Sequence, residues 1–263
     1  SALFVTHAHL DHTGRIPRLV SQGYSGPVYS TVPTKKISEL MLTDSLGVLE
    51  KESRRENTPL VYTEPDIKST MKLWKTVPYH SPVNIGPFSV VLRDSGHILG
   101  SAMVEITYNG KKIIFTGDLG NSPAPLLNDT EKITDADYLV MESVYGDRNH
   151  EPHEEKRRRT EEAIENTVKS GGVLMIPAFS LERTQDLLFE INNLVENGRI
   201  PPVPIYLDSP LAINVTKVYR ESEEFFNKKT RHQIKGGDDI FNFPGLKMTL
   251  STEESKEILR SPS

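Results

Sequence analysis

Three histidines and one aspartate stand within six residues, directly after a short apolar run. The segment reads Thr-His-Ala-His-Leu-Asp-His over residues 6–12, and residues 2–5 before it have the length of a buried strand. Because side chains alternate along extended backbone, His7 and His9 face the same side and can share one cation. Asp11 and His12 follow where a tight loop can bring them to a second cation. The fold must therefore bring further ligands from distant segments to this point.

Two single residues are candidates for those further ligands. His97 is flanked by Gly96 and Gly100, and glycine permits the sharp loop that would present the ring. Asp118 follows an apolar strand, where an unpaired carboxylate is costly to bury and a cation removes that cost. Each feature alone also has an ordinary explanation: a solvated turn for the cluster, a hydrogen-bonded polar residue for His97, and a turn-forming aspartate for Asp118. Their combination favours a site for two metal ions.

The composition restricts the chemistry of such a site. The chain has 263 residues and no cysteine, which excludes disulfides, thiolate nucleophiles, iron–sulfur clusters and cysteine-ligated zinc. Imidazole with carboxylate suits Zn²⁺, or Mn²⁺ where oxygen ligands dominate. Two cations roughly 3.5–4 Å apart lower the pKa of a bridging water and clamp a phosphoryl group. We therefore expect two zinc ions and hydrolysis.

Charge and hydropathy restrict the partners and the location. The net charge of −5 gives no sign of a general nucleic-acid-binding coat, so a polyanion would bind in a local groove. No apolar run is long enough to span a membrane and no signal peptide is visible, which predicts a cytoplasmic protein without membrane contact. The first residue is serine rather than methionine, and an apolar strand follows at once. We expect a piece of a longer protein.

Short β-branched runs alternate with amphipathic stretches, which is typical of an α/β fold. Asn109-Gly110 predicts a hairpin between strands 103–108 and 112–116, and Ser251 with Glu254 has the spacing of a capping box. Helices are expected over 14–22, 34–55, 65–77, 154–169, 181–197 and 211–226, with Ser180 as N-cap of the fifth, and further strands over 27–31, 90–93, 138–141, 173–176 and 203–207. The change of rhythm near residue 146 divides the chain into domains 1–146 and 147–263.

The chain resembles the metallo-β-lactamase superfamily, whose His-x-His-x-Asp-His signature is present at residues 7–12. Within it, the chain is similar to the β-CASP branch, which contains RNA 3′-end processing endonucleases and related bacterial and archaeal ribonucleases. The resemblance implies an α/β fold: a partial metallo-β-lactamase αββα sandwich with an inserted β-CASP domain built on a parallel sheet. It covers most of the chain and rests, beyond the signature, on residues 96–102, 115–120, 140–147, 176–180, 183–185 and 208–212.

The resemblance also assigns site residues. It implies that His7, His9, His97 and Asp118 hold one zinc, and that Asp11, His12 and Asp118 hold the other. Asp11 and Glu142 are the carboxylates with an expected catalytic role, Glu142 by orienting a general-acid histidine; its ordinary explanation is a charge at a strand end. Contacts to substrate are expected from the side chains of Arg183, Ser209 and His150, the last with a solvated loop as its alternative.

The implied activity is zinc-dependent hydrolysis of single-stranded RNA in the cleft between the two domains. Family members carry strands before the first metal motif and two histidines after the β-CASP region, and this sequence contains neither. Three alternatives stay open: a small-molecule metallo-hydrolase, a DNA nuclease of the same branch, and a catalytically inactive RNA-processing subunit. Endonucleolytic and 5′-to-3′ exonucleolytic cleavage are both compatible with these motifs, as are a monomer and a homodimer.

Overall fold

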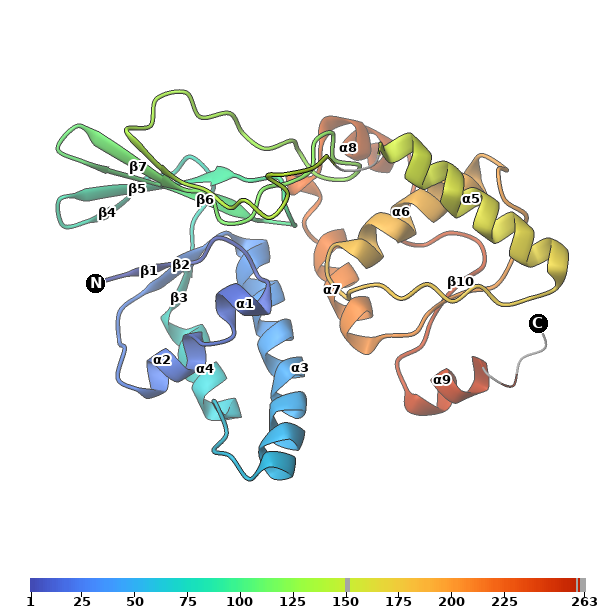
Figure 1. Ribbon diagram of the computed structural model, residues 1–263, viewed down its shortest axis with the longest axis horizontal. Helices are drawn as coiled ribbons and strands as arrows, with labels where there is room; N and C mark the ends of the chain where they lie inside the picture. Colours follow the sequence, from blue (N-terminus) through green and yellow to red (C-terminus); the bar gives the residue numbers. More distant parts are fainter. Residues whose placement is uncertain (150–151, 259, 261–263) are drawn as a thin grey trace. The chain divides into compact units, whose positions relative to one another are not determined.

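The computed structural model describes residues 1–149, 152–258 and 260, and it divides into two compact units, Ser1–Ser143 and Val144–Ser263. His150, one of the expected substrate contacts, lies outside the described residues. Each unit has mixed α/β structure (Figure 1). None of the helices in the described parts of the chain is both long and apolar enough to cross a membrane.

The first unit contains two sheets. One is a parallel sheet of three short strands in the order β1-β2-β3, and the other has five strands in the order β4-β5-β6-β7-β8. Neighbours in the larger sheet are antiparallel except β7 and β8, which are parallel. The strands are β1 (Leu3–Phe4), β2 (Val28–Ser30), β3 (Trp74–Thr76), β4 (Val83–Ile85), β5 (Phe88–Asp94), β6 (Ala102–Tyr108), β7 (Lys111–Phe115) and β8 (Tyr138–Val140).

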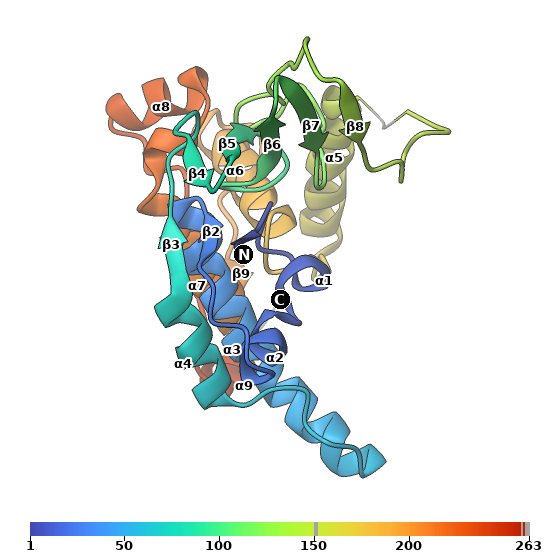
Figure 2. The same cartoon turned by 90° about the vertical axis from the view of Figure 1, so that its left-hand side faces the viewer.

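Apolar side chains hold the two sheets and the helices of this unit together. Leu92 and Val104 of the larger sheet pack with Phe4 and Tyr29 of the smaller one. On the other face of the smaller sheet, Trp74 packs with Ile16 of a covering helix. The helices are α1 (Leu10–Thr13), α2 (Ile16–Ser21), α3 (Val32–Glu56) and α4 (Glu64–Leu73). The view in Figure 2 shows α2, α3 and α4 on the side of β1–β3 away from the larger sheet.

In its described residues, the second unit is mainly helical and has one pair of parallel strands, β9 (Ile205–Leu207) and β10 (Leu246–Met248). Its core contains the rings of Tyr219, Phe226 and Phe241 and the apolar face of α6 (Arg183–Glu196), of which Leu188 and Leu194 are buried. The elements are α5 (His153–Ser170), α6 (Arg183–Glu196), β9 (Ile205–Leu207), α7 (Pro210–Arg220), a 3₁₀ turn (Glu223–Phe225), α8 (Lys228–Lys235), β10 (Leu246–Met248) and α9 (Thr252–Ile258).

Two local predictions are confirmed. Asn109 and Gly110 have φ of 48° and 71° and join β6 to β7, as expected for a two-residue hairpin turn with both central φ positive. At α9, the Glu254 amide donates to Ser251 Oγ at 3.2 Å, and the Ser251 amide donates to a Glu254 carboxylate oxygen at 2.9 Å. This reciprocal pair is the expected capping box.

Three local predictions differ from the structure. The helix expected over 65–77 ends at Leu73, since Trp74 enters β3 and its indole Nε1 donates to Ser30 Oγ at 2.8 Å. Residues 173–176 form no strand, and the parallel pair β9–β10 does not include them. Ser180 is not the N-cap of α6; that position is Glu182.

Candidate functional site

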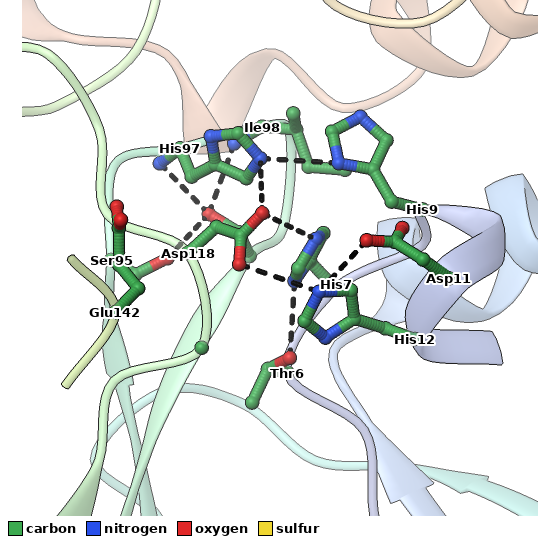
Figure 3. Close-up of polar contacts among 12 residues, drawn as sticks. Thr6, His7, His9, Asp11, His12, Ser95, His97, Ile98, Asp118 and Glu142 are labelled. Atoms are coloured by element: carbon green, nitrogen blue, oxygen red, sulfur yellow. Dashed lines mark hydrogen bonds and ion pairs between the residues drawn. The ribbon is translucent and has the colours of Figure 1, made fainter. Parts of the chain in front are cut away.

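The histidine cluster lies where the first strand passes into the first helix. The backbone amide of Val5 donates a hydrogen bond to Tyr29 O at 2.9 Å, so the parallel sheet fixes the backbone two residues before His7. His9 is the N-cap of α1, and Asp11 and His12 belong to that helix. The expected tight loop is therefore a single helical turn, and it presents Asp11 and His12 beside His7 (Figure 3).

Two glycine-containing loops bring His97 and Asp118 to the same place. The His97 loop follows β5 and the Asp118 loop follows β7. The Gly120 amide donates to Ser95 O at 2.9 Å, which ties the two loops together. A Cβ on Gly120 would lie 2.0 Å from Gly96 O, so only glycine permits this approach.

Four side chains converge on one point. One donor atom from each of His7, His9, His97 and Asp118 lies within 4.8 Å of the donor atoms of the other three. His97 Nε2 is 3.2 Å from His9 Nδ1, and Asp118 Oδ2 is 3.6 Å from both His7 Nε2 and His97 Nε2. Three imidazole nitrogens and one carboxylate oxygen are a ligand set typical of a divalent transition metal ion.

A second group shares the Asp118 carboxylate. His12 Nε2 lies 3.3 Å from Asp118 Oδ1 and 3.5 Å from Asp11 Oδ2. The two oxygens of Asp118 thus face different histidines, which suits a carboxylate between two sites. Exposure increases across the cluster, from 0% for the His7 side chain to 77% for that of Asp11. The side carrying Asp11 is therefore the one open to solvent.

The chemistry of the buried histidine fits a metal ligand. His7 Nε2 is fully buried and has no hydrogen-bond partner among the described residues. Burial, reinforced by the neighbouring histidines, lowers the pKa of His7 to about 2, and burial also lowers the pKa of His9. Both rings are thus neutral at physiological pH, as metal ligation requires. An orphaned, neutral imidazole nitrogen aimed at a carboxylate is the arrangement that a metal ion satisfies.

Thr6 is a supporting residue for which sequence reasoning assigned no role. Its hydroxyl lies 3.0 Å from His7 Nδ1, so that nitrogen is occupied and Nε2 is the one left for a ligand. Such a partner fixes the orientation and tautomer of a ligating imidazole. The signal in the sequence is its place directly before the first histidine.

Glu142 follows β8 and contacts the loop that carries Asp118. Its backbone amide donates to Thr116 Oγ1 at 3.2 Å, and its carboxylate accepts a hydrogen bond from the Leu119 amide at 3.3 Å. Since Leu119 adjoins Asp118, the carboxylate of Glu142 helps to fix the backbone at this position.

Ser209 and Arg183 belong to the second unit. Ser209 is the N-cap of α7, where its Oγ accepts from the Ala212 amide at 3.2 Å and lies 3.3 Å from Ser180 Oγ. Arg183 is the first residue of α6 and is exposed. Amides at helix N-termini favour anions, so both positions suit a phosphate contact.

Glu182, just before Arg183, has a strained backbone. Its φ of 70° and ψ of −70°, with the Arg183 amide donating to Leu181 O at 3.0 Å, form a γ-turn of the rare type with positive φ. Strain of this kind costs about 1–3 kcal/mol in a residue with a Cβ atom.

We predict that Glu182→Gly raises the free energy of unfolding by about 1 kcal/mol, because glycine relieves the strain but gains entropy when unfolded. Urea unfolding followed by circular dichroism measures the change. Glu182→Ala is the matched control, since it removes the carboxylate and keeps the Cβ atom. A glycine variant less stable than the alanine variant would contradict the prediction.

Asp186, one turn further along α6, should make stability depend on pH. Burial raises its pKa from 3.8 to about 7, and the charge of Glu182 adds to the rise. The folded state therefore keeps the proton that the unfolded chain releases near pH 4, and stability falls as the pH rises from 4 to 7.

We predict that Asp186→Asn removes this loss, which amounts to about 2.5 kcal/mol between pH 5 and 8 since one pKa unit is worth about 1.4 kcal/mol. Urea unfolding of the unchanged protein and of Asp186→Asn at pH 5 and pH 8 gives the change in unfolding free energy of each. All other titrating groups contribute equally to both changes, so they cancel in the comparison. The exposed Asp44 supplies the control Asp44→Asn. An unchanged pH dependence in Asp186→Asn would refute the assignment.

Comparison with known proteins identifies two family domains. Residues 1–144 match the metallo-β-lactamase superfamily domain, and residues 184–263 match the β-CASP domain. The chain is 34% identical over 261 residues to ribonuclease TTHA0252 of Thermus thermophilus, covering 99% of this chain and 58% of that protein. It is 33% identical over 241 residues to the transcription termination factor FttA of Methanothermobacter thermautotrophicus, covering 89% of this chain and 37% of that protein.

A further relative gives the same picture. FttA of Pyrococcus horikoshii is 34% identical over 268 residues, covering 99% of this chain and 40% of that protein. The chain thus spans between about two fifths and three fifths of the length of these relatives.

Proposed function

Because the chain belongs to the metallo-β-lactamase superfamily and to its β-CASP branch, we propose that it is a zinc-dependent ribonuclease that hydrolyses phosphodiester bonds of single-stranded RNA. The observation that carries the proposal is the convergence of His7, His9, His97 and Asp118 on one point, with His12 on the other oxygen of Asp118. The names of the relatives, a ribonuclease and transcription termination factors, support RNA as the substrate.

The residues divide into two ligand sets. His7, His9, His97 and Asp118 would hold one zinc or manganese ion, and Asp11, His12 and Asp118 would hold the other. A bound metal pair supplies a Lewis acid that polarises the phosphoryl group and lowers the pKa of water. The substrate would reach such a metal pair from the side that carries Asp11, whose side chain is 77% exposed.

The protein's own residues then have distinct tasks. Thr6 orients the His7 ring through Nδ1, and Glu142 holds the amide next to Asp118. Glu142 is thus a positioning residue for the shared carboxylate. Arg183 and Ser209 offer a guanidinium and a helix N-terminus for RNA phosphates. His150 is the third residue proposed to contact RNA.

The two roles correspond to two domains. We assign the metal ligands to a metallo-β-lactamase domain over residues 1–146 and the phosphate contacts to a β-CASP domain over residues 147–263. The division into compact units at residues 143 and 144 supports a boundary close to this position.

Cleavage of an end-labelled single-stranded RNA tests the proposal, with a DNA strand of the same sequence beside it. The protein is first treated with EDTA and then supplied with Zn²⁺ or Mn²⁺. We expect no cleavage after chelation, cleavage of the RNA after metal is restored, and weaker cleavage of the DNA. Cleavage that persists in EDTA, or a protein that binds zinc and leaves the RNA intact, would refute a metal-dependent ribonuclease.

A further inference from the structure

The loop that carries His97 closes around a buried hydroxyl. Ser101 is 0% exposed, and its Oγ accepts hydrogen bonds from the His97 amide at 3.0 Å and the Ile98 amide at 3.1 Å. Ser95, at the other end of the loop and 1% exposed, places its own Oγ 2.8 Å from Ser101 Oγ. One side chain therefore binds both the ligand residue and the start of its loop.

The turn behind the hydroxyl has a defined shape. The Ser101 amide donates to Ile98 O at 2.9 Å, and Gly100 has φ of 77°, which is a β-turn with a positive φ at its third residue. The carbonyl of Gly100 accepts hydrogen bonds from the Thr31 and Thr34 hydroxyls at 2.6 and 2.8 Å. These contacts anchor the turn to α3 and the residue before it.

The far side of Ser101 is anchored as well. Its carbonyl accepts a hydrogen bond from the Tyr79 hydroxyl at 2.7 Å. Hydrogen bonds from Thr31, from Thr34 of α3 and from Tyr79, after β3, thus fix the backbone around Ser101. Because Ser101 Oγ accepts from the His97 amide, the position of that amide is fixed as well. A histidine ring follows its backbone, so the placement of His97 Nε2 relative to His9 and Asp118 depends on this hydroxyl.

We propose that Ser101 is a positioning residue for the metal ligand His97, acting through the backbone amides of His97 and Ile98. The proposal rests on the metal centre described under the proposed function. Without the hydroxyl, two amides in a buried loop lose their acceptor, and the loop must shift to satisfy them. His97 Nε2 then leaves its place 3.2 Å from His9 Nδ1.

The test is the zinc affinity of the whole chain, measured by competition with a chromophoric chelator and without reference to cleavage. Ser101→Ala should weaken zinc binding by about 10- to 100-fold, the range typical of outer-shell partners of metal ligands. Ser38→Ala is the matched control, because Ser38 is 0% exposed and its Oγ has no hydrogen-bond partner in the described structure. That variant should bind zinc as the unchanged protein does.

A second variant and a second readout separate positioning from general destabilisation. Ser95→Ala removes the neighbouring hydroxyl but leaves the hydrogen bonds from the His97 and Ile98 amides to Ser101 Oγ. The zinc affinity of this variant should therefore fall by no more than a few-fold. Co²⁺ in place of zinc absorbs visible light according to its ligand geometry, and its spectrum should change in Ser101→Ala but not in Ser38→Ala.

Two results would overturn the inference. Equal zinc affinity and equal Co²⁺ spectra in Ser101→Ala and Ser38→Ala would show that the hydroxyl does not position His97, while the metal centre itself stands. An unchanged protein that binds neither metal would remove the metal centre, and with it both the proposed function and this inference.

Discussion

Asp118→Ala is expected to abolish cleavage of RNA and to weaken metal binding more than loss of any other single ligand. The reason is the place of the carboxylate between the two groups: Oδ1 is 3.3 Å from His12 Nε2, and Oδ2 is 3.6 Å from the Nε2 atoms of His7 and His97. Removing it takes one ligand from each set at once. Lewis-acid stabilisation of several kcal/mol then disappears, which corresponds to a rate loss of roughly 10³-fold or more.

The experiment compares initial cleavage rates of end-labelled RNA with the number of zinc ions bound per chain. Asp44→Ala is the matched control, because Asp44 is an exposed aspartate on α3, outside the metal cluster. It should cleave and bind zinc as the unchanged protein does. An Asp118→Ala protein that keeps more than a tenth of the rate would show that this carboxylate is not shared between catalytic metal ions.

The second large effect is expected from Gly120→Ala. A Cβ atom at this position would lie 2.0 Å from Gly96 O and 3.0 Å from His97 N, both of which are backbone atoms that cannot turn aside as a side chain does. The loops carrying His97 and Asp118 must therefore move apart. We expect a loss of about 3 kcal/mol or more of unfolding free energy, at the upper end of overpacking effects, together with loss of zinc binding.

Gly47→Ala is the control for this substitution. Gly47 lies inside α3, and a Cβ atom there would meet no atom within 4 Å beyond its chain neighbours and the backbone of its own helix. Alanine favours a helix interior by about 1 kcal/mol over glycine, so this variant should be more stable than the unchanged protein. Urea unfolding and zinc competition measure both variants. A Gly120→Ala protein with unchanged stability would contradict the close approach of the two loops.

Features that depend on neighbours a few residues apart follow from the amino-acid sequence alone. The Asn109-Gly110 turn and the Ser251 and Glu254 capping box follow from local backbone preferences, and both are present in the structure. The lack of cysteine excluded whole classes of metal site. The alternation of side chains indicated that His7 and His9 act together, although the single turn of α1 that carries Asp11 and His12 was not visible in the pattern.

Contacts between distant segments become visible in the folded protein, because they depend on packing rather than on local periodicity. It brings His97 within 3.2 Å of His9, 88 positions apart in the chain. Trp74 lies in β3 rather than in the expected helix, because its indole is buried and donates a hydrogen bond to Ser30 Oγ.

The same reason explains why Ser101 and Glu182 had no role assigned in advance. The role of the Ser101 hydroxyl depends on the backbone amides that donate to it in the folded loop. The positive φ of Glu182 likewise depends on how the folded chain enters α6. Residue type and spacing therefore predict which side chains can bind a metal ion. The surrounding fold decides which of their atoms face one another.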